Sequence, residues 1–272
     1  HTEKRKGSVF PGIEDSVGLV CAAKGSMSGS VKRMNVDRFL LAPGLSAAPD
    51  RKENQMKKVL VIGMYDNAMY HPLTGVEEAL EGMFPELELV ITDQITALCD
   101  TAQYDAVLSY WDDWEKPIPD REAESLCQYV AGGGSLLVLH NGISLQLQDS
   151  LAKLIGGKFL THPAQEVIPF LPQKHLLTVG CEAFSLMEEP YQFTLEDDQK
   201  EIFLTYTYHG EAYPAGWCKS FQAGRVVYLA PGHTTEKFSC KAYVRLIRNC
   251  MAWLLGSTLS DPAPTYTSGT GS

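Results

Sequence analysis

The sequence lacks any long hydrophobic run. No apolar segment among its 272 residues approaches the roughly 20 residues that a membrane-spanning helix needs, because glycine, histidine or charged residues interrupt every candidate. The N-terminal stretch also has no hydrophobic core of the kind found in secretory signals. We therefore expect no membrane partner and a cytoplasmic location.

Basic charge and paired cysteines are also scarce. The chain has 23 Lys and Arg against 33 Asp and Glu, a formal net charge of -10, whereas nucleic-acid sites and contacts with anionic membranes require basic patches. The seven cysteines are odd in number, widely scattered and without a C-x-x-C pair. This pattern predicts reduced thiols, with neither a disulfide framework nor a structural zinc knuckle, and no nucleic-acid partner.

A common cofactor-binding motif and a common catalytic motif are absent. The loop that follows the first apolar strand, MYDNAMYHPL, has no G-x-G-x-x-G, so no nucleotide cofactor is expected. The turn after the strand at 136–139 reads His140-Asn141-Gly142-Ile143-Ser144, with neither Cys nor Ser at its tip. That turn carries the nucleophile in many hydrolases, so covalent catalysis from this position is disfavoured.

The apolar pattern predicts an α/β fold. Short apolar runs at 59–63, 87–92, 104–109, 136–139 and 224–230 are typical of strands, and the uninterrupted run at 136–139 is typical of a strand buried on both faces. They alternate with helical segments at 74–84, 93–99, 119–131, 145–155 and 239–255, the first opened by a Thr74/Glu77 capping box. Between 166 and 221 the pattern changes to short strands and turns. We expect a mostly parallel sheet with an antiparallel β extension.

Charge divides the chain near residue 56. Residues 1–55 carry nine Lys and Arg against six Asp and Glu, and the remainder carries fourteen against twenty-seven. Residues 1–55 are interpreted as a disordered or non-native leader, with a genuine N-terminal arm as the alternative. We assign 56–256 to one domain and 257–272 to a disordered tail rich in Pro, Ser, Thr and Gly.

Polar side chains follow the predicted parallel strands at their carboxyl ends. His71, Asp112, His140 and His233 come from four different strands, and His162 follows in a nearby loop. Ligands bind at this edge of open α/β sheets, so convergence there predicts a site for a divalent metal such as Zn²⁺ on His71, His140 and His233, or for acid/base chemistry. Any one of these histidines could instead be a loop cap or a satisfied semi-buried residue.

Further residues are candidates for holding a substrate. Aromatic rings can stack on a sugar, and polar groups next to the strand ends can bind its hydroxyls. Core packing is the alternative for the aromatics, and a solvated turn for Glu188-Glu189-Pro190-Tyr191. The predicted set is Asn67, Trp111, Asn141, Tyr191 and Trp217, with Glu189 as an additional carboxylate.

Four segments, GGGSLLVLHNG, LIGGKFLTHP, EEPYQF and PAGWCKSFQAGRVVYLAPGH, together resemble the ThuA-like, trehalose-utilisation family over about residues 57–256. The resemblance implies a flavodoxin-like three-layer sandwich related to class I glutamine amidotransferases, and a role in disaccharide or keto-sugar metabolism. It also implies a site around His71, His140, His162 and His233. The elbow cysteine of amidotransferases is missing, and Thr234-Thr235-Glu236 follows His233 where they have His-x-Glu, so glutaminase activity is not expected.

Three hypotheses follow. The first is a sugar-processing protein, a keto-sugar isomerase or hydrolase, with His140 and His233 as acid/base or metal-binding groups, Asp112 and Glu189 as carboxylates, and Tyr191 and His162 contacting the sugar. The second is a catalytically inactive ligand-binding or assembly module on the same fold. The third is a hydrolase acting through Cys99 or Cys218. A small-molecule sugar is the expected partner, and a homo-oligomer is left open.

Overall fold

The computed structural model describes residues 56–195 and 199–258. The predicted leader at 1–55 and residues 259–272 of the predicted tail lie outside them. The strands are β1 Lys57–Gly63, β2 Leu87–Thr92, β3 Ala106–Tyr110, β4 Ser135–Leu139, β5 Gly157–Thr161, β6 Glu166–Pro172, β7 Phe184–Glu188, β8 Gln192–Leu195, β9 Glu201–Tyr208, β10 Glu211–Phe221 and β11 Gly224–Leu229. The α-helices are α1 Val76–Met83, α2 Asp120–Ala131, α3 Asp149–Ile155 and α4 Lys241–Leu255, and the 3-10 helices are η1 Ile95–Gln103, η2 His140–Leu147, η3 Leu176–Thr178 and η4 Thr235–Ser239.

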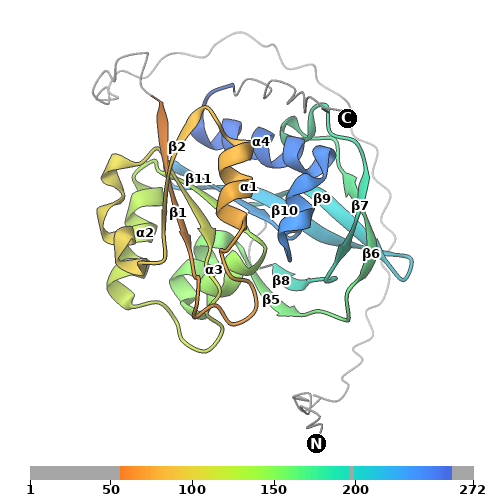
Figure 1. Cartoon of the computed structure of the whole chain (residues 1–272), viewed down its shortest axis with the longest axis horizontal. Helices are drawn as coiled ribbons and strands as arrows, with labels where there is room; N and C mark the ends of the chain where they lie inside the picture. Colours follow the sequence, from red (N-terminus) through yellow and green to blue (C-terminus); the bar gives the residue numbers. More distant parts are fainter. Residues whose placement is uncertain (1–55, 196–198, 259–272) are drawn as a thin grey trace, which may run out of the picture. The chain divides into compact units, whose positions relative to one another are not determined.

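One large sheet organises the domain. Its nine strands run in the order β2-β1-β3-β4-β11-β10-β9-β6-β7. Pairings from β2 to β11 are parallel, and those from β11 to β7 are antiparallel. A small antiparallel sheet joins β5 to β8. Helices α1 and α4 cover one face of the parallel half and α2 and α3 the other, which gives three layers (Figure 1).

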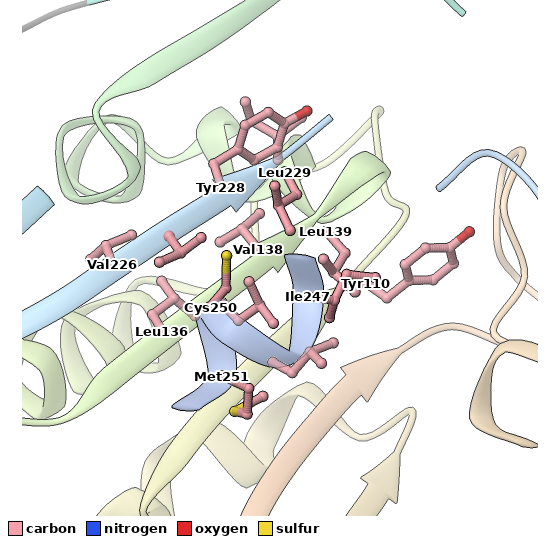
Figure 2. Close-up of a cluster of buried hydrophobic side chains, with 14 of the residues drawn as sticks. Tyr110, Leu136, Val138, Leu139, Val226, Tyr228, Leu229, Ile247, Cys250 and Met251 are labelled. Atoms are coloured by element: carbon pink, nitrogen blue, oxygen red, sulfur yellow. The ribbon is translucent and has the colours of Figure 1, made fainter. Parts of the chain in front are cut away.

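The apolar core lies on both faces of the parallel strands. Every residue of β3 and of β4 is buried, as expected for strands sandwiched between helices. On one face of the sheet, helix α4 packs against these strands. Figure 2 shows this packing, with Leu136 and Val138 of β4 and Val226 and Tyr228 of β11 beside Ile247, Cys250 and Met251 of α4.

The predicted fold class is confirmed: the chain is α/β, with a flavodoxin-like parallel half and an antiparallel extension. One local prediction was wrong, and two predicted helices differ from the structure in their type or bounds. The N-cap residue of α1 is Gly75, which has no side chain to accept a hydrogen bond, so Thr74 and Glu77 form no capping box. Residues 95–103 form a 3-10 helix kinked at Asp100, and the helix expected at 145–155 is split into η2 and α3.

Within the described residues, no helix combines the length and the apolar character needed to cross a membrane. The six cysteines of this part of the chain are all free thiols.

Candidate functional site

Four side chains meet at the carboxyl edge of the parallel strands. His71 follows β1, His140 follows β4, His233 follows β11, and Glu189 follows β7 at the far end of the antiparallel extension. One ligand atom from each lies within 4.8 Å of the corresponding atoms of the other three. We call this group the donor cluster. The structure therefore brings together the three histidines predicted to bind metal and one of the predicted carboxylates.

His140 is the first residue of η2 and directly follows β4. Its φ of 44° lies in the left-handed region, where a non-glycine residue is uncommon. Nδ1 lies 2.6 Å from the carbonyl oxygen of Ala230, which can only accept, so Nδ1 carries the hydrogen and Nε2 keeps a lone pair. Burial, together with the neighbouring His71, holds the pKa of His140 well below its usual range. The ring is therefore neutral at physiological pH.

His71 is oriented by Asp112. The Asp112 carboxylate, which is fully buried, accepts backbone N–H groups of Tyr70 and His71, and its other oxygen faces His71 Nδ1 at 3.1 Å and the Trp114 indole at 3.0 Å. Burial alone would raise the pKa of Asp112, but these donors lower it. Because both oxygens are occupied by donors, Asp112 positions His71 and does not face a substrate, which corrects the catalytic role expected for it.

Glu188 fixes the loop that carries His233. This buried carboxylate accepts the backbone N–H groups of Gly232, at 2.7 Å, and of His233, at 3.1 Å, through one oxygen. The Tyr110 hydroxyl donates to the Gly232 carbonyl at 2.7 Å, so the same peptide is held from both sides. Burial raises the pKa of Glu188 to about 7. Sequence reasoning did not select Glu188, and its only signal was the Glu-Glu pair before Pro190.

Glu189 faces the imidazoles. Its Oε2 is buried and lies 3.2 Å from His233 Nδ1, yet it has no hydrogen bond of good geometry to any described residue. Its Oε1 lies 3.7 Å from Nε2 of His162, which is partly exposed and is fixed through Nδ1 to the Pro163 carbonyl at 2.8 Å. Burial would raise the pKa of Glu189, but His233 and the other nearby histidines lower it, which favours the carboxylate.

The donor cluster fits a divalent metal ion. The His71 Nε2–His233 Nδ1, His233 Nδ1–Glu189 Oε2, His71 Nε2–His140 Nε2 and His140 Nε2–Glu189 Oε2 distances are 2.9, 3.2, 3.3 and 3.8 Å. Ligand atoms at about 2.1 Å from a tetrahedral zinc ion lie about 3.4 Å apart. Two facing Nε2 lone pairs repel unless a proton or a cation lies between them. His71 and His140 each donate the N–H of their other ring nitrogen, to Asp112 and to the Ala230 carbonyl, as metal-binding histidines generally do.

The other residues predicted to bind substrate do not belong to the donor cluster. Asn67 is exposed in the loop after β1, and its role stays a prediction. Asn141 donates to the carbonyls of Tyr110 and Trp111, while its Oδ1 and the Trp111 indole N–H are buried without a partner among the described residues. Trp217 is wrong as a sugar-stacking residue, because its fully buried indole packs on Tyr228 and donates to the Ile155 carbonyl at 2.8 Å.

The cysteine hypothesis finds no support in the local geometry. Cys218 lies 3.8 Å from His175 Nε2, which lies 3.2 Å from a Glu201 carboxylate oxygen. His175 Nδ1 accepts the Leu177 N–H, so Nε2 carries the hydrogen and cannot take the thiol proton. Burial raises the pKa of Cys218 to about 12. Cys99 is hydrogen-bonded to Glu122 at 3.5 Å, on the α2 side of the sheet.

Comparison with protein families decides the assignment. A family model described as ThuA, trehalose utilisation, matches residues 58–254, most of the chain. The chain belongs to the ThuA family. The resemblance found in the sequence is thereby confirmed. A search of curated proteins finds no match.

Solved structures agree with this family fold. A ThuA-like protein from Bacteroides uniformis has a TM-score of 0.60 and 18% identity over 78% of this chain and 95% of that one. A ThuA-like protein from Parabacteroides merdae has a TM-score of 0.63 and 13% identity over 78% and 94%. A β-galactosidase from Bacillus circulans matches with a TM-score of 0.54 and 14% identity over 76% of this chain but only 32% of that one. At these identities the likeness is one of fold.

Proposed function

We propose that this ThuA-family chain is a metal-assisted sugar-processing enzyme, an isomerase or hydrolase that acts on a trehalose-type disaccharide or a keto-sugar. The family supports a role in trehalose utilisation or carbohydrate processing. The observation that carries the enzymatic proposal is the donor cluster, with three imidazole nitrogens and a carboxylate oxygen at spacings that suit one cation. Zinc suits this mixed nitrogen and oxygen set.

Two residues of the donor cluster, His71 and His140, have fixed orientations that suit metal binding. A divalent ion held here would act as a Lewis acid on a substrate carbonyl. His71 and His140 are buried, and their Nδ1 protons are held by Asp112 and Ala230, so each presents only Nε2. Both are therefore better suited to binding a metal than to moving a proton.

Proton transfer is assigned to His162, which lies outside the donor cluster and beside its Glu189. His162 keeps about a third of its side chain exposed, and its Nε2 faces Glu189 Oε1. Isomerisation of a keto-sugar moves a proton between carbon atoms next to the carbonyl, and hydrolysis needs a base for water. We propose that His162 accepts and returns that proton. The proposed substrate is a small-molecule sugar, and no nucleotide cofactor is proposed.

The test combines metal analysis with ligand binding. Purified protein should contain one divalent ion per chain by elemental analysis, and disaccharides or their 3-keto derivatives should raise its melting temperature. His233→Asn should abolish the metal content and the sugar-dependent shift. His209→Asn is the matched control, because His209 is exposed in the β9–β10 hairpin at a φ of 49° that asparagine tolerates.

Two outcomes would reject the enzyme proposal. The first is protein without stoichiometric metal whose melting temperature no sugar changes. The second is a His233→Asn variant that processes the sugar as fast as His209→Asn. A sugar-dependent shift without turnover would favour the non-catalytic ligand-binding module.

A further inference from the structure

Tyr191 is held rigidly beside the donor cluster. Its ring stacks on those of His140 and His162, with centroid distances of 4.5 and 5.5 Å, and Phe159 packs against it at 4.4 Å. Its carbonyl oxygen accepts the Tyr206 hydroxyl at 2.8 Å. The side chain is almost fully buried. The phenol oxygen therefore has little freedom to move away from the cluster.

The Tyr191 hydroxyl donates to His140 Nε2, 3.1 Å away. The direction of this bond follows from the other ring nitrogen, since His140 Nδ1 has its hydrogen committed to the Ala230 carbonyl. His140 Nε2 thus has one lone pair in the ring plane and no hydrogen. It is the same lone pair that the donor cluster would offer to a cation.

A lone pair cannot bind a cation and accept a hydrogen bond at the same time. When a cation takes His140 Nε2, the Tyr191 O–H loses the acceptor that the described structure gives it, in a buried position where an unpaired donor is costly. The phenol oxygen remains about one hydrogen-bond length from a ligand atom. A ligand oxygen that approaches the cation would therefore arrive within reach of this donor.

We propose that Tyr191 is a catalytic hydrogen-bond donor. When a cation binds His140 Nε2, the Tyr191 hydroxyl would donate its hydrogen bond to the carbonyl oxygen of the substrate in place of His140. This inference rests on the proposed metal-assisted function and adds a residue that recognises the reacting oxygen. Tyr191 makes and breaks no covalent bond in this step: its hydrogen bond changes acceptor, and the proton stays on the phenol oxygen. Preorganised donors of this kind stabilise negative charge that develops on a carbonyl oxygen.

The experiment compares Tyr191→Phe with Tyr213→Phe, whose hydroxyl bonds to Glu211 on the surface of the extension. Each protein is stripped of metal, titrated with Co²⁺ while its visible spectrum is recorded, and then titrated with acetohydroxamate as a small oxygen ligand. Tyr191→Phe should bind Co²⁺ as tightly as wild type or several-fold more tightly, because the phenol no longer competes. It should bind acetohydroxamate about 10- to 100-fold more weakly, the effect expected for a lost hydrogen bond to a charged oxygen. Tyr213→Phe should match wild type in both titrations.

The outcomes separate this inference from the proposed function. Equal acetohydroxamate affinity in Tyr191→Phe and wild type, with Co²⁺ bound by both, would overturn the role of Tyr191 alone. Weaker Co²⁺ binding with unchanged affinity for acetohydroxamate would assign Tyr191 a purely structural role and also overturn it. A wild-type protein that takes up no Co²⁺ would overturn both proposals.

Discussion

Replacing Glu188 with glutamine should make the metal-free protein more stable at alkaline pH. The carboxylate is 1% exposed, and burial raises its pKa from 4.5 to about 7 although two backbone N–H groups oppose the rise. A rise of about 2.5 in pKa corresponds to about 3 kcal/mol of folding free energy at about 1.4 kcal/mol per pH unit. Glutamine keeps an oxygen that can accept the Gly232 and His233 N–H groups but has no charge to bury.

The sign of the effect follows from proton binding. Below about pH 4.5 the carboxyl is protonated in both the folded and the unfolded chain, and its contribution to stability is complete. Between about pH 4.5 and 7 the folded chain binds more protons than the unfolded chain, so the free energy of unfolding falls as the pH rises, and above pH 7 it levels off. Glu188→Gln removes this loss because the amide resembles the protonated acid at every pH.

Urea unfolding of chelator-treated protein at pH 4.5 and pH 8 measures the difference. The two proteins should have nearly equal stability at pH 4.5, and Glu188→Gln should be more stable by up to about 3 kcal/mol at pH 8. Glu182→Gln, at an exposed site before β7, serves as the control and should follow wild type. Parallel pH profiles for wild type and Glu188→Gln would refute the reasoning.

Three other perturbations give distinct results. Gly232→Ala should lower the free energy of unfolding by about 1–3 kcal/mol in a denaturation experiment and weaken metal binding at least 10-fold. The reason is that φ at Gly232 is 144° and an added Cβ would lie 3.0 Å from the Cβ of His140. The control Gly210→Ala has open space around the added Cβ, so it should cost only backbone strain and bind metal normally. Asp112→Asn should weaken Zn²⁺ binding about 10- to 100-fold in calorimetry, because an amide cannot accept all the donors around it, whereas its neighbour Asp113→Asn should not. Iodoacetamide at pH 8 should leave sugar processing intact, because with a pKa of about 12 only about one Cys218 thiol in 10⁴ is ionised; rapid inactivation traced to Cys218 by mass spectrometry would contradict this.

Local sequence signals were sufficient for the parallel half of the sheet. The apolar runs at β1, β3, β4 and β11 mark strands that are buried on both faces, and the rule that ligands bind at the carboxyl ends of such strands placed His71, His140 and His233 together. Helix starts were less predictable. The split between η2 and α3 lies at Gln148, whose extended backbone (φ -89°, ψ 119°) interrupts the helix although glutamine is a good helix former.

The antiparallel extension shows where sequence reasoning fails. Glu188 and Glu189 are adjacent in the chain, yet one carboxylate is buried against the Gly232 loop and the other faces the imidazoles. That division depends on how β7 pairs with β6 at the edge of the sheet, which is a nonlocal property. Trp217 likewise belongs to the core because β10 pairs with β11 and places its ring on Tyr228. Composition alone does not separate a core aromatic from one that contacts a ligand.

The most direct test of the account is calorimetric titration of the chelator-treated full chain with Zn²⁺ at neutral pH. The arrangement of His71, His140, Glu189 and His233 predicts one ion per chain, with an affinity that His140→Ala and His233→Asn each reduce by at least 100-fold. The His209→Asn control should retain wild-type affinity. Absence of stoichiometric binding, or binding that survives both substitutions within the donor cluster, would contradict the metal centre and the function built on it.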